Sequence, residues 1–168
     1  MAVELLTKSD VITDATANPV VKSLPENNGK LRRAEAIVTT TGTTTTNGST
    51  YLAVRLPANA VLKWGSIQGQ GSIDLPNVDV GVRQVDSPNT LDDDALATAL
   101  DIDDTGDHVF IGANGDQDTT KQLWEWADAA GTAFNGVNPG GLFDIHLSLD
   151  ADAVAAGTCK VIVDYVVE

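Results

Sequence analysis

The sequence contains a single cysteine, Cys159, few basic residues and no long apolar run. One cysteine excludes an internal disulfide framework and any zinc or iron–sulfur site built from several thiolates. Ten Lys and Arg residues stand against 24 Asp and Glu residues, so the formal charge is −14, which repels nucleic acid and anionic lipid. No apolar run approaches the ~18–20 residues of a membrane-spanning helix. We therefore expect no nucleic-acid partner and no membrane partner.

The residues that are present fit one globular domain preceded by an arm. A chain of 168 residues with 42% hydrophobic and 20% charged residues can bury a core without disulfides or metals. Residues 1–30 differ from the rest, because Asn18-Pro19, Leu24-Pro25 and Glu26-Asn27-Asn28-Gly29 interrupt any regular period. We interpret residues 1–30 as an extended N-terminal arm, with a frayed terminus as the alternative. Residues 31–168 are predicted to form a single β-sandwich domain.

Most of this domain shows the short apolar alternation that is typical of strands. The clearest case is Leu142–Leu149, in which apolar and polar residues alternate. Turn sequences such as Leu56-Pro57-Ala58-Asn59 separate the segments, because proline fixes φ and lacks a backbone donor. The other segments predicted as strands are Leu31–Thr41, Thr50–Leu56, Ala60–Gly69, Asn77–Arg83, Val109–Ile111 and Thr158–Val167.

Two further segments are more typical of helices. Asp92–Leu100 begins with three aspartates, which the helix dipole favours at an N-terminus. Lys121–Ala130 contains Leu123, Trp124 and Trp126, and it is predicted to form a short helix or a buried aromatic crossing. Short strands separated by turns, with no long helices alternating between them, predict a mostly β protein. We expect an antiparallel β-sandwich, jelly-roll-like, with one or two short helices and an extended N-terminal arm.

The acidic residues contain two motifs that must be weighed, an aspartic-protease tripeptide and a partial calcium-binding loop. Asp104-Thr105-Gly106 is the tripeptide of retroviral-type aspartic proteases, but its acidic neighbours are typical of a solvated turn rather than of a buried dyad. The same segment partly matches a calcium loop, although glycine replaces the glutamate at position 12. A solvated run of charge is the alternative that the composition favours, and we expect no cofactor. The candidate calcium ligands are Asp101, Asp103, Thr105 and Asp107.

The other reactive residue types do not form a catalytic set. His108 and His146 are the only histidines, and neither has a second ligand at metal-binding spacing. Cys159 lies in an apolar segment, where it is more typical of a small buried hydrophobe than of a nucleophile. The three tryptophans are more typical of a core, although exposed tryptophans on a β-sandwich can stack on sugars. We therefore predict that the protein is not an enzyme.

Four stretches, read in order, resemble a group of small virion proteins of tailed bacteriophages, the capsid decoration (cement) proteins. With the variable middle included, they span about two-thirds of the chain. No stretch is diagnostic alone, and the order of the four carries the resemblance. The resemblance brings no catalytic residues with it. The stretches are Tyr51–Trp64 (YLAVRLPANAVLKW), Val78–Val82 (VDVGV), Leu123–Glu125 (LWE) and Gly141–Tyr165 (GLFDIHLSLDADAVAAGTCKVIVDY).

The chain departs from that pattern in two places. Arg83 follows the second stretch where the group more often has an aromatic residue, and Asp86–Asp118 is a long acidic segment. These departures concern partner contacts in the acidic segment more than the fold.

The resemblance implies a non-enzymatic structural protein of a phage virion, made in the host cytoplasm. Such a protein would bind the outer surface of the capsid, stabilise contacts between major capsid protein subunits and self-associate as a trimer or dimer. A glycan-binding β-sandwich module of a tail fibre or host-attachment protein is the alternative. The Thr-rich tract 39–50 could add a strand to a neighbouring sheet edge or form a surface loop. The candidate partner-binding residues are Val20, Val21, Leu24, Thr43, Thr44, Thr45 and Thr46.

Overall fold

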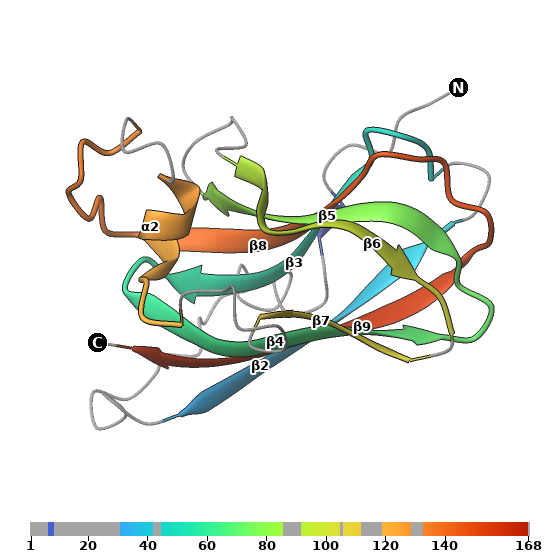
Figure 1. The fold of residues 1–168 in the computed structure, drawn as a ribbon, viewed down its shortest axis with the longest axis horizontal. Helices are drawn as coiled ribbons and strands as arrows, with labels where there is room; N and C mark the ends of the chain where they lie inside the picture. Colours follow the sequence, from blue (N-terminus) through green and yellow to red (C-terminus); the bar gives the residue numbers. More distant parts are fainter. Residues whose placement is uncertain are drawn as a thin grey trace.

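Two β-sheets packed face to face form the protein, with a short helix at one end (Figure 1). The structure is a computed structural model that describes residues 7–8, 31–41, 45–85, 92–104, 106–111, 119–128 and 133–167. The predicted mostly β sandwich is confirmed. Its elements are β1 (Thr7–Lys8), β2 (Arg32–Thr40), β3 (Thr50–Pro57), β4 (Ala60–Gln70), β5 (Leu75–Gln84), β6 (Asp92–Ile102), β7 (Asp107–Ile111), α2 (Leu123–Ala127), β8 (Leu142–Leu149) and β9 (Gly157–Val167).

The strand order gives the topology. The five-stranded sheet has the order β1-β3-β8-β5-β6, and the four-stranded sheet has the order β2-β9-β4-β7. Neighbouring strands pair antiparallel, except that β1 lies parallel to β3. Apart from β1, each sheet has four strands, and most connections pass from one sheet to the other. This is the arrangement of an eight-stranded jelly roll, as the sequence predicts.

Alternation along the strands places one face of each sheet in a shared core. On β8, Phe143, Ile145 and Leu147 are fully buried in this core, whereas Asp144 and His146 lie on the outward face. The apolar face is therefore continuous from one sheet to the other. Other core residues on the neighbouring and facing strands include Val54, Leu56, Leu62, Ile67, Val80, Val82, Val161 and Val163.

The segment Asp92–Leu100, predicted as a helix, is instead part of strand β6. It pairs with β5 in an irregular register, and its Leu96 is fully buried in the core. One irregularity is held by Asp79, whose carboxylate accepts a 2.8 Å hydrogen bond from the backbone N–H of Ala99, where φ is +55°. Strand pairing and burial at the sheet edge therefore outweigh the local helix preference of this sequence.

The second predicted helix, within Lys121–Ala130, is present as α2. The backbone N–H of Gln122 donates to Glu125 Oε2 at 2.6 Å, which caps the first turn. Leu123 and Trp126 are buried in the core, so α2 packs at one end of the sandwich (Figure 1). In the part of the chain that the structure describes, no helix has the length and apolar character needed to cross a membrane.

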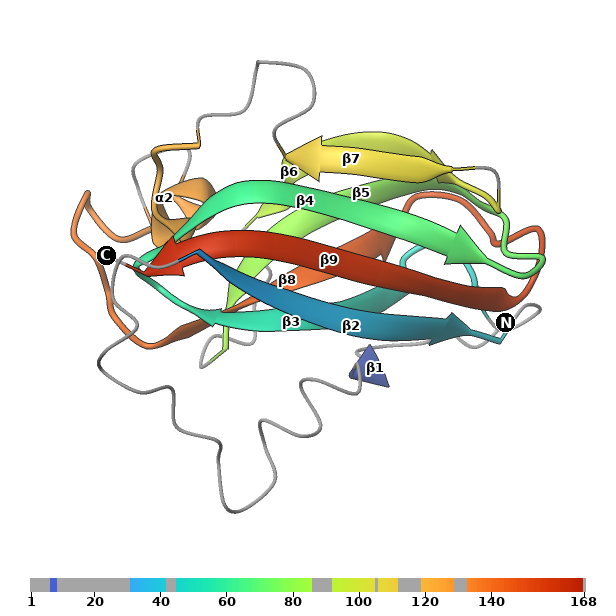
Figure 2. The same cartoon turned by 90° about the horizontal axis from the view of Figure 1, so that it is seen from below.

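Strand β1 lies at the edge of the five-stranded sheet (Figure 2). Thr7 and Lys8 pair with Tyr51 and Leu52 of β3. A short part of the predicted arm therefore adds a strand to the body. The rest of residues 1–30 lies outside the described residues, so the division into arm and domain at residue 31 stays a prediction.

Candidate functional site

The outward face of the five-stranded sheet carries charged side chains that are nevertheless buried. Asp144, on the central strand β8, is 1% exposed and accepts two hydrogen bonds from Arg55 of β3, at 2.7 Å from Nε and 3.0 Å from Nη2. Arg83 of β5 lies opposite Asp144 on the other side and is also buried. Asp144 therefore forms an ion pair with β3 and is in register with a buried arginine on β5, and the two hydrogen bonds from Arg55 tie β8 to β3.

His146 follows on the same face of β8 and has no exposed surface. Its Nε2 lies 3.0 Å from Asp93 Oδ1, at the start of β6. Gly81 of β5 lies opposite His146, and a Cβ there would be only 2.5 Å from the imidazole ring and 2.4 Å from the backbone oxygen of Asp92. The missing side chain thus makes room for the ring beneath β6. In this structure the imidazole has no exposed surface that a substrate could contact.

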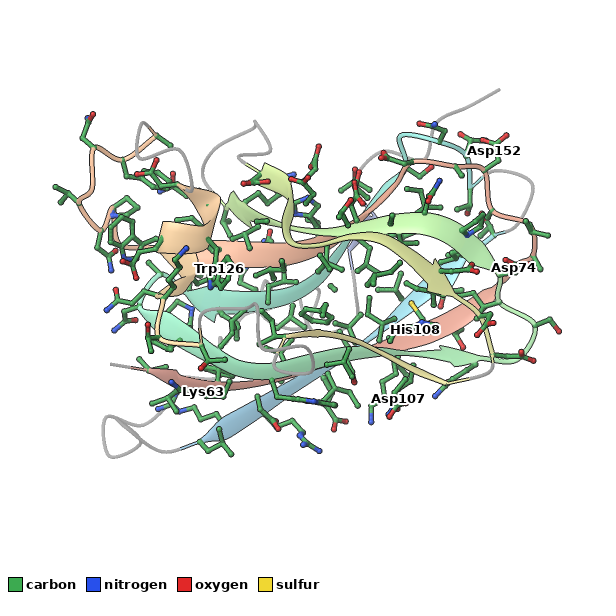
Figure 3. All side chains as sticks on the ribbon, viewed as in Figure 1. Lys63, Asp74, Asp107, His108, Trp126 and Asp152 are labelled. Atoms are coloured by element: carbon green, nitrogen blue, oxygen red, sulfur yellow. The ribbon has the colours of Figure 1, made fainter. Side chains whose placement is uncertain are left out.

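Carboxylates gather near this histidine, on β5, β6 and the loop after β8. The pKa of Asp150 is raised, mainly by the negative charge of Asp79, and that of Asp92 is raised, mainly by burial. Two further aspartates, Asp74 and Asp152, lie together at the end of the sandwich opposite to Trp126 (Figure 3). Among the described residues, no three His, Cys, Asp or Glu side chains are arranged so that they could hold a metal ion.

Three of the candidate calcium ligands are described: Asp101 lies near the end of β6, Asp103 in the turn that follows, and Asp107 at the start of β7. Asp101 and Asp107 are exposed, and Asp103 Oδ1 lies 3.6 Å from His108 Nε2. Thr105 lies outside the described residues, so the calcium site stays a prediction. Asp104 of the protease-like tripeptide is exposed in the same turn, as the acidic flanks of that tripeptide predict.

The outward face of the four-stranded sheet has a different character. Arg33 of β2 donates to Asp164 of β9 at 2.7 and 2.9 Å, and Lys160 Nζ lies 2.7 Å from Glu35 Oε2. The pKa of Asp164 is lowered, mainly by the hydrogen bond from Arg33. The four strands of this sheet contain four basic and three acidic residues, whereas those of the five-stranded sheet contain three basic and six acidic residues. An acidic partner would therefore meet less repulsion at the four-stranded sheet.

The Thr-rich tract, proposed as a docking segment, turns inward where the structure describes it. Thr45 is 1% exposed, and its Oγ1 lies 2.8 Å from the buried Tyr51 hydroxyl. Thr46 is 8% exposed, and its backbone N–H donates to Ser49 Oγ. Thr45 and Thr46 therefore offer little side-chain surface to a partner in this structure, and their role in partner binding stays a prediction. The remaining candidates, Val20, Val21, Leu24, Thr43 and Thr44, lie outside the described residues.

The three tryptophans differ in burial. Trp126 is 8% exposed and belongs to the core, as predicted, whereas Trp64 and Trp124 are half-buried. Trp124 donates from Nε1 to Gln122 Oε1, which also accepts a hydrogen bond from Asn138. Asn138 lines a pocket of about 360 Å³ at this end, together with Ala58, Asn59, Gly140 and Gly141. The lining residues that the structure describes offer amide groups and backbone but no ionisable side chain.

Cys159 is expected to resist alkylation in the folded protein. It is fully buried in the core, and burial raises the pKa of its thiol to about 12. Because an exposed thiol has a pKa of about 8.5, the fraction of reactive thiolate at pH ~8 is lower by about three orders of magnitude in the folded state. Intact-mass analysis after iodoacetamide treatment should show labelling at least about a hundredfold slower without urea than with it. Equal rates would contradict the burial.

The sequence alone did not reveal the paired charges on the two outward faces. Alternation places Arg55, Asp144 and His146 on polar strand faces, but it does not say which strands are neighbours. One sequence feature indicated such pairs, namely a charged residue in the middle of an otherwise apolar strand. When that face of the strand is covered, the charged side chain requires a partner of opposite charge or a hydrogen bond.

No protein-family profile matches the sequence, and no curated protein matches it. Among solved structures, a chain of one titled "Capsid of Ralstonia phage GP4" aligns with a TM-score of 0.62. The alignment covers 97% of this chain and 98% of that chain, with 16% sequence identity. The two chains therefore share a fold over nearly their whole lengths.

Proposed function

We propose that this protein is a non-enzymatic structural component of a phage virion that binds the outer surface of the capsid and stabilises contacts between major capsid protein subunits. The observation that carries the proposal is the likeness in fold, over nearly the whole chain, to a chain from a phage capsid structure. The sequence resemblance to capsid decoration proteins was drawn from local stretches and supports the same conclusion independently of the fold. The protein would be made in the host cytoplasm and become part of the virion.

The charge distribution is suited to this role. Free copies with a formal charge of −14 repel one another in solution, whereas the four-stranded sheet has nearly balanced charge in its strands. Weak contacts on such a face become durable when several are engaged at once on a repeating shell. The buried ion pair between Arg55 and Asp144 on the five-stranded sheet favours a rigid body over a reactive one, because the two groups already contact each other and are shielded from solvent.

Copy number in purified virions tests the proposal. We expect quantitative mass spectrometry to find this chain in numbers comparable to the shell subunits, because a protein that stabilises subunit contacts must occur at each repeat. The recombinant protein should also co-sediment with capsids that lack it and raise their resistance to heat or low salt. A handful of copies per virion, or no binding to such capsids, would contradict the proposal.

A glycan-binding module of a tail fibre is the second candidate, favoured by the pocket beside Asn59 and Asn138 near half-buried Trp124. Tryptophan fluorescence separates the two functions, since a capsid-stabilising protein needs no response to sugars. A saturable change on titration with glycans, combined with a low copy number, would support the tail-fibre function instead.

A further inference from the structure

We propose that this protein docks on the capsid through the end of the sandwich that carries α2, and that the partner is an acidic, protruding loop of a capsid subunit. The inference rests on the proposed function, because it identifies which surface would make the contact. The α2-end patch consists of Lys63, Lys121, Val137 and Leu142, together with the pocket that Asn138 lines.

Contacts within the chain bring the members of this patch together. The side chain of Gln122, just before α2, accepts a 3.0 Å hydrogen bond from Asn138, the neighbour of Val137 in the chain. Lys63 Nζ donates to the backbone oxygen of Thr119 at 2.7 Å, so β4 is tied to the segment that leads into α2. The start of β4, α2 and the loop before β8 therefore meet at one end of the sandwich (Figure 1).

The two lysines of the patch contact no carboxylate among the described residues. Lys63 donates to a backbone oxygen, and Lys121 Nζ lies 4.8 Å from the centre of the Trp126 ring. In contrast, Arg33 and Lys160, on strands β2 and β9 of the four-stranded sheet, already contact carboxylates of the same chain. The patch can therefore form new ion pairs with an acidic partner, whereas Arg33 and Lys160 would first have to leave their own.

The loops at the opposite end of the sandwich carry charge of one sign. The β4–β5, β6–β7 and β8–β9 connections lie there and contain five aspartates but no lysine or arginine. Figure 3 shows two of them, Asp74 and Asp152, at the end opposite to Lys63 and Trp126. An acidic partner would be repelled by this end, so a docked copy would turn it away from the capsid. The five aspartates are Asp74, Asp103, Asp104, Asp150 and Asp152.

The loop that follows α2 holds the apolar part of the patch in a fixed position. The Asp128 carboxylate accepts hydrogen bonds from the backbone N–H groups of Ala133 and Phe134, at 2.6 and 3.1 Å, and the Phe134 ring packs against two other aromatic rings. Val137 and Leu142 are nevertheless 67% and 44% exposed. A partner that covers them would bury apolar surface without first having to order this loop, which lowers the entropic cost of docking.

The shape of the patch selects a partner that protrudes. Its pocket of about 360 Å³ lies between the β3–β4 turn and the loop before β8, and its described lining residues have no charged side chain. An apolar or uncharged side chain at the tip of a partner loop suits this pocket, while carboxylates on the flank of the loop suit Lys63 and Lys121. A flat partner surface would leave the pocket unfilled.

Charge reversal in the patch tests the docking end. We expect the parent chain to co-sediment with capsids that lack it, and the double variant Lys63→Glu, Lys121→Glu to raise the Kd about tenfold or more, because attraction to carboxylates becomes repulsion. Val137→Asp should also raise the Kd, because it places a carboxylate in front of an acidic partner. Val137 is mostly exposed, so this variant tests the patch even if the double variant fails to fold.

Two variants at the opposite end are the controls. Val154→Asp changes a similarly exposed valine, 71% exposed, and Asp104→Lys reverses an exposed charge. Both should leave the Kd for capsids unchanged. Patch variants that bind as tightly as the parent, or weaker binding by the control variants alone, would overturn the docking end while leaving the proposed function intact.

Two further outcomes separate this inference from its alternatives. A parent chain that does not bind capsids would contradict the proposed function and this inference with it. Sedimentation equilibrium of the free chains tests a second copy as the occupant. If the patch variants dissociate an oligomer of the parent chain but leave the Kd for capsids unchanged, the patch binds another copy and the proposal is wrong.

Discussion

Asp144→Ala is expected to lower the free energy of unfolding by about 3–5 kcal/mol, the loss typical of breaking a buried ion pair. The Asp144 and Arg55 side chains are 1% and 11% exposed, and Arg83 is buried opposite the same carboxylate. The substitution leaves the buried Arg55 guanidinium in place and removes the carboxylate that accepts its two hydrogen bonds. Urea denaturation followed by circular dichroism measures the loss.

The outward face of the other sheet supplies a matched control. Arg33 and Asp164 form the same two-bond contact, at 2.7 and 2.9 Å, but their side chains are 54% and 16% exposed. Because solvent screens exposed charges, Asp164→Ala should cost only a small part of what Asp144→Ala costs. If the two variants lost equal stability, burial would not be the source of the effect at Asp144.

Gly81→Ala is expected to cost about 1–3 kcal/mol, although it adds only one methyl group. The new Cβ would lie 2.4 Å from the backbone oxygen of Asp92 and 2.5 Å from the imidazole of His146. Either the start of β6 must shift or the ring must move, and both responses disturb the contact between His146 and Asp93. Thermal and urea unfolding give the magnitude.

Gly106→Ala is the control for this variant, because a Cβ at Gly106 meets no atom within 4 Å. It should change stability by no more than about 0.5 kcal/mol. A Gly81→Ala protein as stable as the parent would show that the space beside Gly81 is not closed by His146 and β6.

The sheets were the part of the fold that local sequence could predict. Period-two alternation placed Leu142–Leu149 with the bounds of β8, and it placed β4 and β9 to within a residue or so at each end. Such alternation is a property of each strand by itself, so one sequence suffices to show it. The jelly-roll topology was expected from the number and spacing of strands rather than from any one of them.

The missed features depend on contacts between distant segments. Local sequence predicts a helix for the acidic and alanine-rich segment that begins at Asp92, and only its pairing with β5 shows that it is a strand. Local sequence likewise predicts an exposed Thr45, and only its hydrogen bond with Tyr51 shows that it is buried. The same limit applies to the candidate site. Arg55 and Asp144 are 89 positions apart, and only the order of strands brings them together.

The position of β9 determines when the four-stranded sheet can form during synthesis of the chain. This last described strand lies inside the four-stranded sheet, between β2 and β4, so that sheet cannot close until Gly157–Val167 has been synthesised. Pairing between segments so distant in the chain is slow, because a long loop must first be ordered. Translation products that stop before β9 would lack an inner strand of this sheet, the one that pairs with both β2 and β4. The four-stranded sheet can therefore form only in copies that have been translated to the end of β9.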